Sequence, residues 1–151
     1  MKTKNLKLIA KTEDDLRVIS AHLQDSIVNS KDIASLKKNK IFLMQLNRFM
    51  WEDAEKGVFR KNKRIRTILK FDNVLEVKSK NINQNKKNTF LDFLAIETEF
   101  MPDKNYEMKL IFSGNAAIKL KVEAIEAKLD DQGDYWESKN KPTHEDVWCL
   151  K

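Results

Sequence analysis

Cysteine, proline and glycine are scarce in this chain, and it has no long hydrophobic run. Its 151 residues include one cysteine, Cys149, two prolines and three glycines. A single cysteine excludes an intramolecular disulfide, which suits a reducing cytoplasm. So few glycines and prolines exclude collagen and most low-complexity classes. No apolar stretch reaches the roughly 18 residues of a transmembrane helix, and none behind Lys2 and Lys4 fits a secretory signal.

Motifs that identify common enzyme and metal-binding classes are also missing. The sequence has no Gly-rich phosphate loop, no nucleophile elbow and no EF-hand loop. Its two histidines, His22 and His144, stand far apart, so we expect no metal site and no cofactor. A non-enzymatic module is therefore favoured. The alternative is a small enzyme in which His22 acts as general acid or base beside a carboxylate such as Asp25 or Glu52.

Charge is abundant instead, and it is unevenly distributed. The formal net charge is +6, with 24 lysines and five arginines. Residues 1–55 carry +2, residues 56–87 carry +9 and residues 88–151 carry −5. A genome biased toward AT-rich codons would explain the many lysines, but it would not concentrate them in one segment. The segregation therefore favours an acidic partner.

The basic segment supplies a first candidate binding surface. Its residues are Arg60, Lys61, Lys63, Arg64 and Arg66. If residues 64–71 form a strand, Arg64 and Arg66 lie about 7 Å apart on one face, where they would contact phosphates, and lysines of 78–87 would extend the patch. Only Phe59 lies inside the basic run, which gives base stacking little support. The structural alternative is a solvated sheet face that resists edge pairing.

A polar and aromatic cluster is the second candidate. Its residues are His22, Asp25, Arg48, Trp51 and Glu52. His22 flanks the apolar stripe of the first helix, and Asp25 follows it within one turn. Arg48 interrupts an apolar strand face, and a buried arginine needs a partner, for which Glu52 is nearest in sequence. The cluster indicates either an anion or ligand site, or a structural ion pair covered by Trp51.

Hydrophobic periodicity predicts the secondary structure. We expect strands at residues 6–10, 26–36, 41–50, 64–71, 74–77, 90–100, 108–112 and 118–122, and a loop at 78–88. Residues 51–57 are expected to form a loop or a single helical turn. A helix is expected over 13–25, with Thr12 as its N-cap. A second helix is expected from Val122, with Gly133 as the residue that ends it. Gly114-Asn115 is a plausible hairpin turn.

Sequential short strands joined by tight turns argue for an antiparallel sheet, and helices at both ends of the run argue for the α+β class. We expect a single domain over 1–151, with an ordered core at about 6–137 and a polar tail at 138–151. The predicted fold is a bent antiparallel sheet or split barrel with an N-terminal helix and a closing C-terminal helix. A pleckstrin-homology-like barrel has the same order of elements.

Blocks of sequence along most of the chain share the pattern of one known family. They are Leu6–Ala10, Asp15–Asp25, Leu46–Phe49 with Trp51-Glu52, Phe71–Leu75, Leu94–Ile96, Leu110–Leu120 and Val122–Ala127. Together they resemble a small bacterial family, domain of unknown function 2948, over residues 6 to about 144. The resemblance implies a family but no activity, ligand or site residue. The lysine- and asparagine-rich residues 78–88 depart from the family pattern, and residues 148–151 lie beyond it.

These observations favour a non-enzymatic cytoplasmic module that binds a protein or an acidic surface. Nucleic-acid binding through the basic segment 60–87 is the first alternative, and the enzyme built on His22 is the second.

Overall fold

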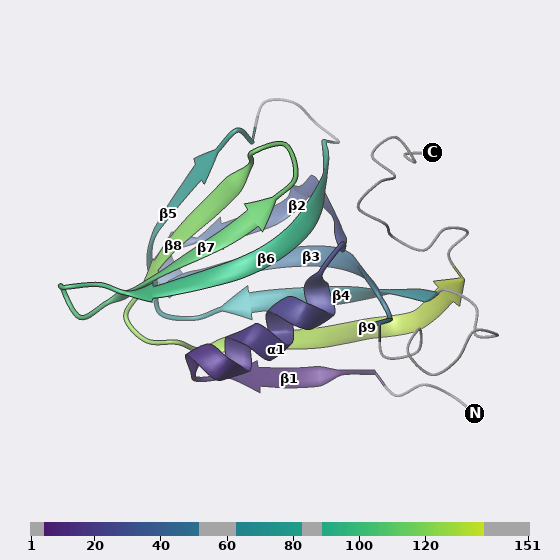
Figure 1. Ribbon diagram of the computed structural model, residues 1–151, viewed down its shortest axis with the longest axis horizontal. Helices are drawn as coiled ribbons and strands as arrows, with labels where there is room; N and C mark the ends of the chain where they lie inside the picture. Colours follow the sequence, from purple (N-terminus) through teal and green to yellow (C-terminus); the bar gives the residue numbers. More distant parts are fainter. Residues whose placement is uncertain (1–4, 52–62, 83–88, 138–151) are drawn as a thin grey trace.

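The computed structural model describes residues 5–51, 63–82 and 89–137, and Figure 1 shows their arrangement. The elements are β1 (Lys7–Ala10), α1 (Glu13–Leu23), β2 (Ile27–Leu36), η1 (Lys37–Asn39, a 3-10 turn), β3 (Ile41–Phe49), β4 (Lys63–Phe71), β5 (Val74–Lys80), β6 (Phe90–Phe100), β7 (Tyr106–Phe112), β8 (Ala117–Val122) and β9 (Ala127–Glu137). The loop expected at 78–88 begins later, because Lys78 to Lys80 belong to β5. Most of the expected loop at 51–57, and the whole tail at 138–151, lie outside the described residues.

All nine strands belong to one antiparallel sheet, in the order β1-β9-β4-β3-β2-β6-β7-β8-β5. Two halves meet where Ile27–Asn29 of β2 pair with Phe90–Asp92 of β6. In Figure 1 the half made of β6, β7, β8 and β5 folds over the half made of β2, β3, β4, β9 and β1. The core therefore lies between two layers of a single bent sheet, and each layer keeps an outer face.

Helix α1 lies at the open side of this fold, between β6 and β1 (Figure 1). Its N-cap is confirmed, because the Thr12 hydroxyl accepts a hydrogen bond from the Asp15 N–H at 3.1 Å and satisfies one free donor of the first turn. The helix buries Leu16, Ile19 and Leu23. The Ser20 hydroxyl accepts a hydrogen bond from the Ile96 N–H at 3.0 Å. The helix thus covers the part of β6 that extends beyond its pairing with β2.

Strand alternation fills the core from both layers. The half made of β2, β3, β4, β9 and β1, hereafter the lower layer, contributes the inward side chains of β3 and β4. The half made of β6, β7, β8 and β5, hereafter the upper layer, contributes those of β6, β7 and β8. The largest of these apolar side chains are Phe42, Phe71, Phe93 and Phe112. Phe93 and Phe112 pack edge to face, with ring centroids 5.6 Å apart. Alternating side chains leave polar residues on the outer faces of both layers.

The prediction of a C-terminal helix is wrong. Residues 127–137 form β9, which pairs with β1 on one side and β4 on the other. The inward residues of this strand are Ala127, Leu129 and Asp131, all buried at a period of two. The helical spacing that suggested otherwise joins residues of different elements, because Val122 ends β8 whereas Leu129 lies on β9.

Gly133, expected to end that helix, lies inside β9. Its φ of 69° is a backbone conformation that favours glycine, next to a register shift between β4 and β9. The α+β class, with a split or pleckstrin-homology-like barrel closed by a C-terminal helix, is therefore wrong. The described residues form an open nine-stranded sheet with one α-helix. The β7–β8 connection does contain the expected turn residues, with φ of 71° at Gly114 and 59° at Asn115.

Candidate functional site

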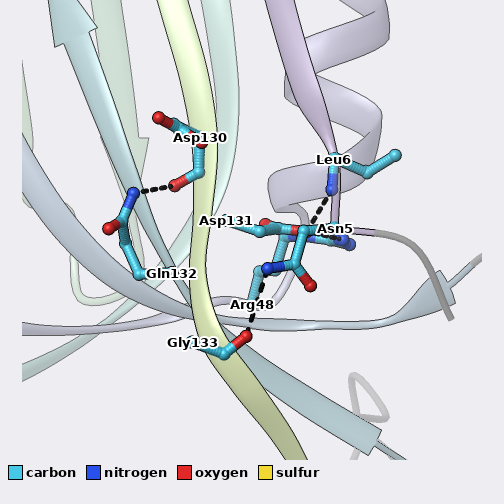
Figure 2. Close-up of polar contacts among 7 residues, drawn as sticks. All are labelled: Asn5, Leu6, Arg48, Asp130, Asp131, Gln132 and Gly133. Carbon is cyan, nitrogen blue, oxygen red and sulfur yellow. Dashed lines mark hydrogen bonds and ion pairs between the residues drawn. The ribbon is translucent and has the colours of Figure 1, made fainter. Parts of the chain in front are cut away.

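Arg48 is fully buried and its partner is Asp131, which comes from a distant part of the chain. The Arg48 Nε and Nη2 atoms donate to the two carboxylate oxygens of Asp131 at 2.9 and 2.7 Å. Asp131 also accepts the Leu6 N–H at 2.8 Å. Figure 2 shows the pair beside β9. The expected partner, Glu52, lies outside the described residues. This ion pair ties β3 and β9 to the residue before β1, which is a structural role.

Part of the predicted polar cluster does assemble, at one end of β3. The Trp51 Nε1 donates to the Gln24 carbonyl at 2.9 Å, and its ring packs on Phe49 with centroids 4.6 Å apart. Asp25 follows in the same turn. Arg48 is excluded from this group, because adjacent strand residues point to opposite faces and Phe49 takes the outer one. His22 lies half-buried on α1.

Arg64 joins this end of the sheet and does not project into solvent. Only 8% of its surface is exposed. Its Nη1 donates to the carbonyls of Asp25 at 3.3 Å and Asn47 at 3.1 Å, and its guanidinium lies 5.7 Å from the Phe49 ring centroid. Burial lowers the pKa of Arg64, and the nearby charges of Asp25 and Asp92 oppose this. Arg64 is therefore a fixed cation at the edge of a surface.

That surface is the outer face of the four neighbouring strands β1, β9, β4 and β3, hereafter the outer face. Cross-strand pairing places Asn47 beside Arg66 and Arg66 beside Gln132. The next row toward the strand ends places Phe49 beside Arg64 and Arg64 beside Trp136. The residues of the outer face are Lys7, Ile9, Leu43, Gln45, Asn47, Phe49, Arg64, Arg66, Ile68, Lys70, Lys128, Asp130, Gln132 and Trp136.

The centre of the outer face carries polar groups that are available for binding. Within the described part of the chain, the side chains of Gln45, Asn47 and Arg66 make no hydrogen bond or ion pair. The Gln132 side chain donates to the Asp130 carbonyl at 3.2 Å, which leaves its oxygen open. Figure 2 shows Gln132 on the opposite side of β9 from the buried Arg48 pair. Trp136 is 40% exposed. Within the described residues, arginine, amide and indole groups therefore gather on one surface.

The two outer faces of the bent sheet differ in charge. The outer face of β1, β9, β4 and β3 bears five basic residues and one acidic residue, a net charge of +4: Lys7, Arg64, Arg66, Lys70 and Lys128 against Asp130. Two adjoining depressions of about 590 and 480 Å³ share Glu107 and Lys119 on the outer side of β5–β8, and the first is also lined by residues of α1. The charges on this side of the sheet pair with each other, as in Lys121–Asp103 at 2.9 Å and Lys78–Glu76 at 3.1 Å. On the first face Lys70 pairs with Asp72 at 3.6 Å and the buried Arg64 lies near the charges of Asp25 and Asp92. Its uncompensated positive charge therefore comes from Lys7, Arg66 and Lys128.

The predicted basic patch is divided by the fold. Arg66 is exposed on the outer face, and Arg64 is buried at its edge. The Lys63 ammonium lies 4.3 Å from the Tyr135 ring centroid. Arg60 and Lys61 lie outside the described residues. The lysines of β5 belong to the opposite end of the sheet order.

Sequence reasoning missed the aromatic part of this site. Tyr135 and Trp136 reach the basic residues through the pairing of β9 with β4. The basic run itself shows only Phe59, so aromatic rings were not expected there. The available signal was the period-two burial of Ala127, Leu129 and Asp131, which identifies β9 as a strand and brings its end beside Arg64.

Comparison with known proteins gives a family and no activity. In residues 5–51, 63–82 and 89–137, no group of three His, Cys, Asp or Glu residues is placed to hold a metal ion. The single α-helix of these residues is too short and too polar to span a bilayer. No curated protein and no solved structure matches the chain. The family model described as "Protein of unknown function (DUF2948)" matches residues 6–144, and the chain belongs to that family.

Proposed function

We propose that this protein is a non-enzymatic binding module that engages an acidic partner through the outer face of β1, β9, β4 and β3. The observation that carries the proposal is Arg66, which pairs with none of the described residues and lies at the centre of a surface with a formal net charge of +4. Unpaired cations on one face raise the local concentration of an anionic partner and speed its association. The proposal places the module in a bacterial cytoplasm, where a lone cysteine such as Cys149 stays reduced.

The other candidate surfaces support binding less well. The depressions over β5–β8 are lined by lysines and carboxylates that neutralise each other, so an acidic partner would have to break these pairs. Neither depression is lined by His22 or Asp25, which an enzyme built on these residues would require. On the outer face, Arg66 and Lys128 pair with none of the described residues and need no such rearrangement.

Charge reversal on the outer face is expected to abolish retention on a polyanion. We expect an Arg66→Glu, Lys128→Glu variant to elute from heparin resin at much lower salt than the unmodified protein. Both side chains are exposed and belong to the same face, so the change removes the net positive charge of the surface and leaves the core intact. The elution conductivity in a salt gradient is the measurement.

The matched control reverses two lysines of the opposite layer, Lys109→Glu and Lys119→Glu. The net charge of the protein changes by the same amount, and both positions lie on outer faces of β7 and β8. The proposal predicts a small shift for this control. Equal shifts for the two double variants would show that retention reflects overall charge, and the proposed face would be rejected.

A further inference from the structure

We propose that the acidic partner is single-stranded RNA, with one base stacked on Trp136 and the neighbouring backbone held by Arg66. This inference rests on the proposed function, since it uses the same outer face. It identifies the class of partner from the uncharged polar and aromatic side chains of that face. A purely electrostatic contact would not need these side chains.

Trp136 is placed as a stacking platform. The residue is 40% exposed, although it lies beside the buried Arg64 in the strand pairing. Arg64 is itself fixed by carbonyls of Asp25 and Asn47 and by the Phe49 ring. Because this part of β9 is paired with β4, the backbone that carries the Trp136 ring is already fixed before a base covers the ring. Stacking of this kind is tolerant of sequence, because every base has a π-face.

The amide side chains indicate a partner with both donors and acceptors. Gln45, Asn47 and Gln132 surround Arg66 on strands β3 and β9. An amide offers an acceptor oxygen and two donor hydrogens, which matches base edges and the 2′-hydroxyl of RNA. The carboxylates of an acidic protein surface are acceptors alone, so they would use the cations and leave the amide oxygens and the indole without a role.

Single-stranded form follows from the shape of the surface. The outer face is a sheet surface formed by four neighbouring strands, and among the described residues Trp51 and the turn at Asp25 cover only its end at Phe49 and Arg64. Bases must be unstacked and splayed to reach a tryptophan and side-chain amides, and sequence-reading sheet platforms take RNA in that form. Arg66 would then contact a phosphate, and binding would weaken as salt rises.

The test is fluorescence anisotropy of a labelled single-stranded RNA of mixed sequence, about ten nucleotides long. We expect Trp136→Ala to weaken binding roughly 5- to 150-fold, the effect of removing one stacking contact. Trp136→Phe keeps an aromatic ring, so we expect it to keep most of the RNA affinity. That result would show that the loss of affinity in Trp136→Ala does not come from misfolding. The control is Phe100→Ala, which removes an exposed aromatic residue (55% exposed) at the last position of β6, away from the outer face. We expect this variant to bind the RNA as tightly as the unmodified protein does.

Heparin retention and a DNA strand of the same sequence separate the possible failures. We expect Trp136→Ala to elute from heparin resin unchanged, whereas Arg66→Glu weakens both RNA binding and heparin retention. Full RNA affinity in Trp136→Ala would overturn the inference and leave the proposed function standing. Equal affinity for the DNA strand would overturn the assignment to RNA. An Arg66→Glu variant that is unaffected in both assays would overturn the inference and the proposed function together.

Discussion

Replacing Asp131 with alanine is expected to lower the free energy of unfolding by about 3–5 kcal/mol, as for other broken buried ion pairs. The substitution removes the carboxylate that binds Arg48 through two hydrogen bonds and accepts the Leu6 N–H. The guanidinium stays in the core without this compensating charge, and β1 loses one of its attachments to β9. Urea denaturation followed by circular dichroism measures the loss.

Two further variants identify the ion pair as the cause. Asp130→Ala removes the neighbouring carboxylate on the outer face, and we expect a change within about 0.5 kcal/mol, as at other surface positions. The double variant Arg48→Met, Asp131→Leu removes both charges, and it should be more stable than Asp131→Ala because no buried charge is left. If Asp131→Ala and Asp130→Ala have equal stability, the pair does not stabilise the fold as described.

Replacing Phe112 with alanine is expected to lower the free energy of unfolding by about 3–5 kcal/mol, the usual cost of a large cavity. Phe112 is buried between the layers, where it packs edge to face against Phe93. The ring joins the upper layer of the sheet to the core, and neighbouring side chains on a paired strand cannot collapse fully into the space. Chemical denaturation again measures the difference.

The same substitution at Phe90 provides the control. Phe90 begins β6 and is 65% exposed, so its removal creates no cavity. We expect its free energy of unfolding to stay within about 0.5 kcal/mol of the unmodified protein. A loss at Phe90 as large as that at Phe112 would contradict the two-layer arrangement of the core.

Local patterns in the sequence predict most of the elements correctly. The Thr12 cap and the apolar spacing of Leu16, Ile19 and Leu23 identify α1 because both are properties of one helix. Alternation along β3 and β4 likewise separates buried from exposed positions. The periodicity after Val122 misleads because a turn lies between β8 and β9, so helical spacing arises between residues that never share a helix.

Contacts between distant segments are what the sequence does not reveal. Arg48 indicates a buried cation, but its partner Asp131 lies 83 positions away on a strand that was expected to be a helix. Trp136 joins the basic residues for the same reason, through the pairing of β9 with β4. The basic segment is visible in composition, yet the fold buries Arg64, exposes Arg66 and carries the lysines of β5 to the other end of the sheet.

The most direct test of the central claim is to map an anionic ligand onto the two faces of the sheet by nuclear magnetic resonance. A short heparin oligosaccharide would be titrated into isotope-labelled protein while the backbone amide and side-chain signals are followed. The account predicts that the largest shifts occur at Asn47, Arg66 and Gln132. Shifts concentrated instead at Lys109 and Lys119, on the layer whose charges pair internally, would contradict it.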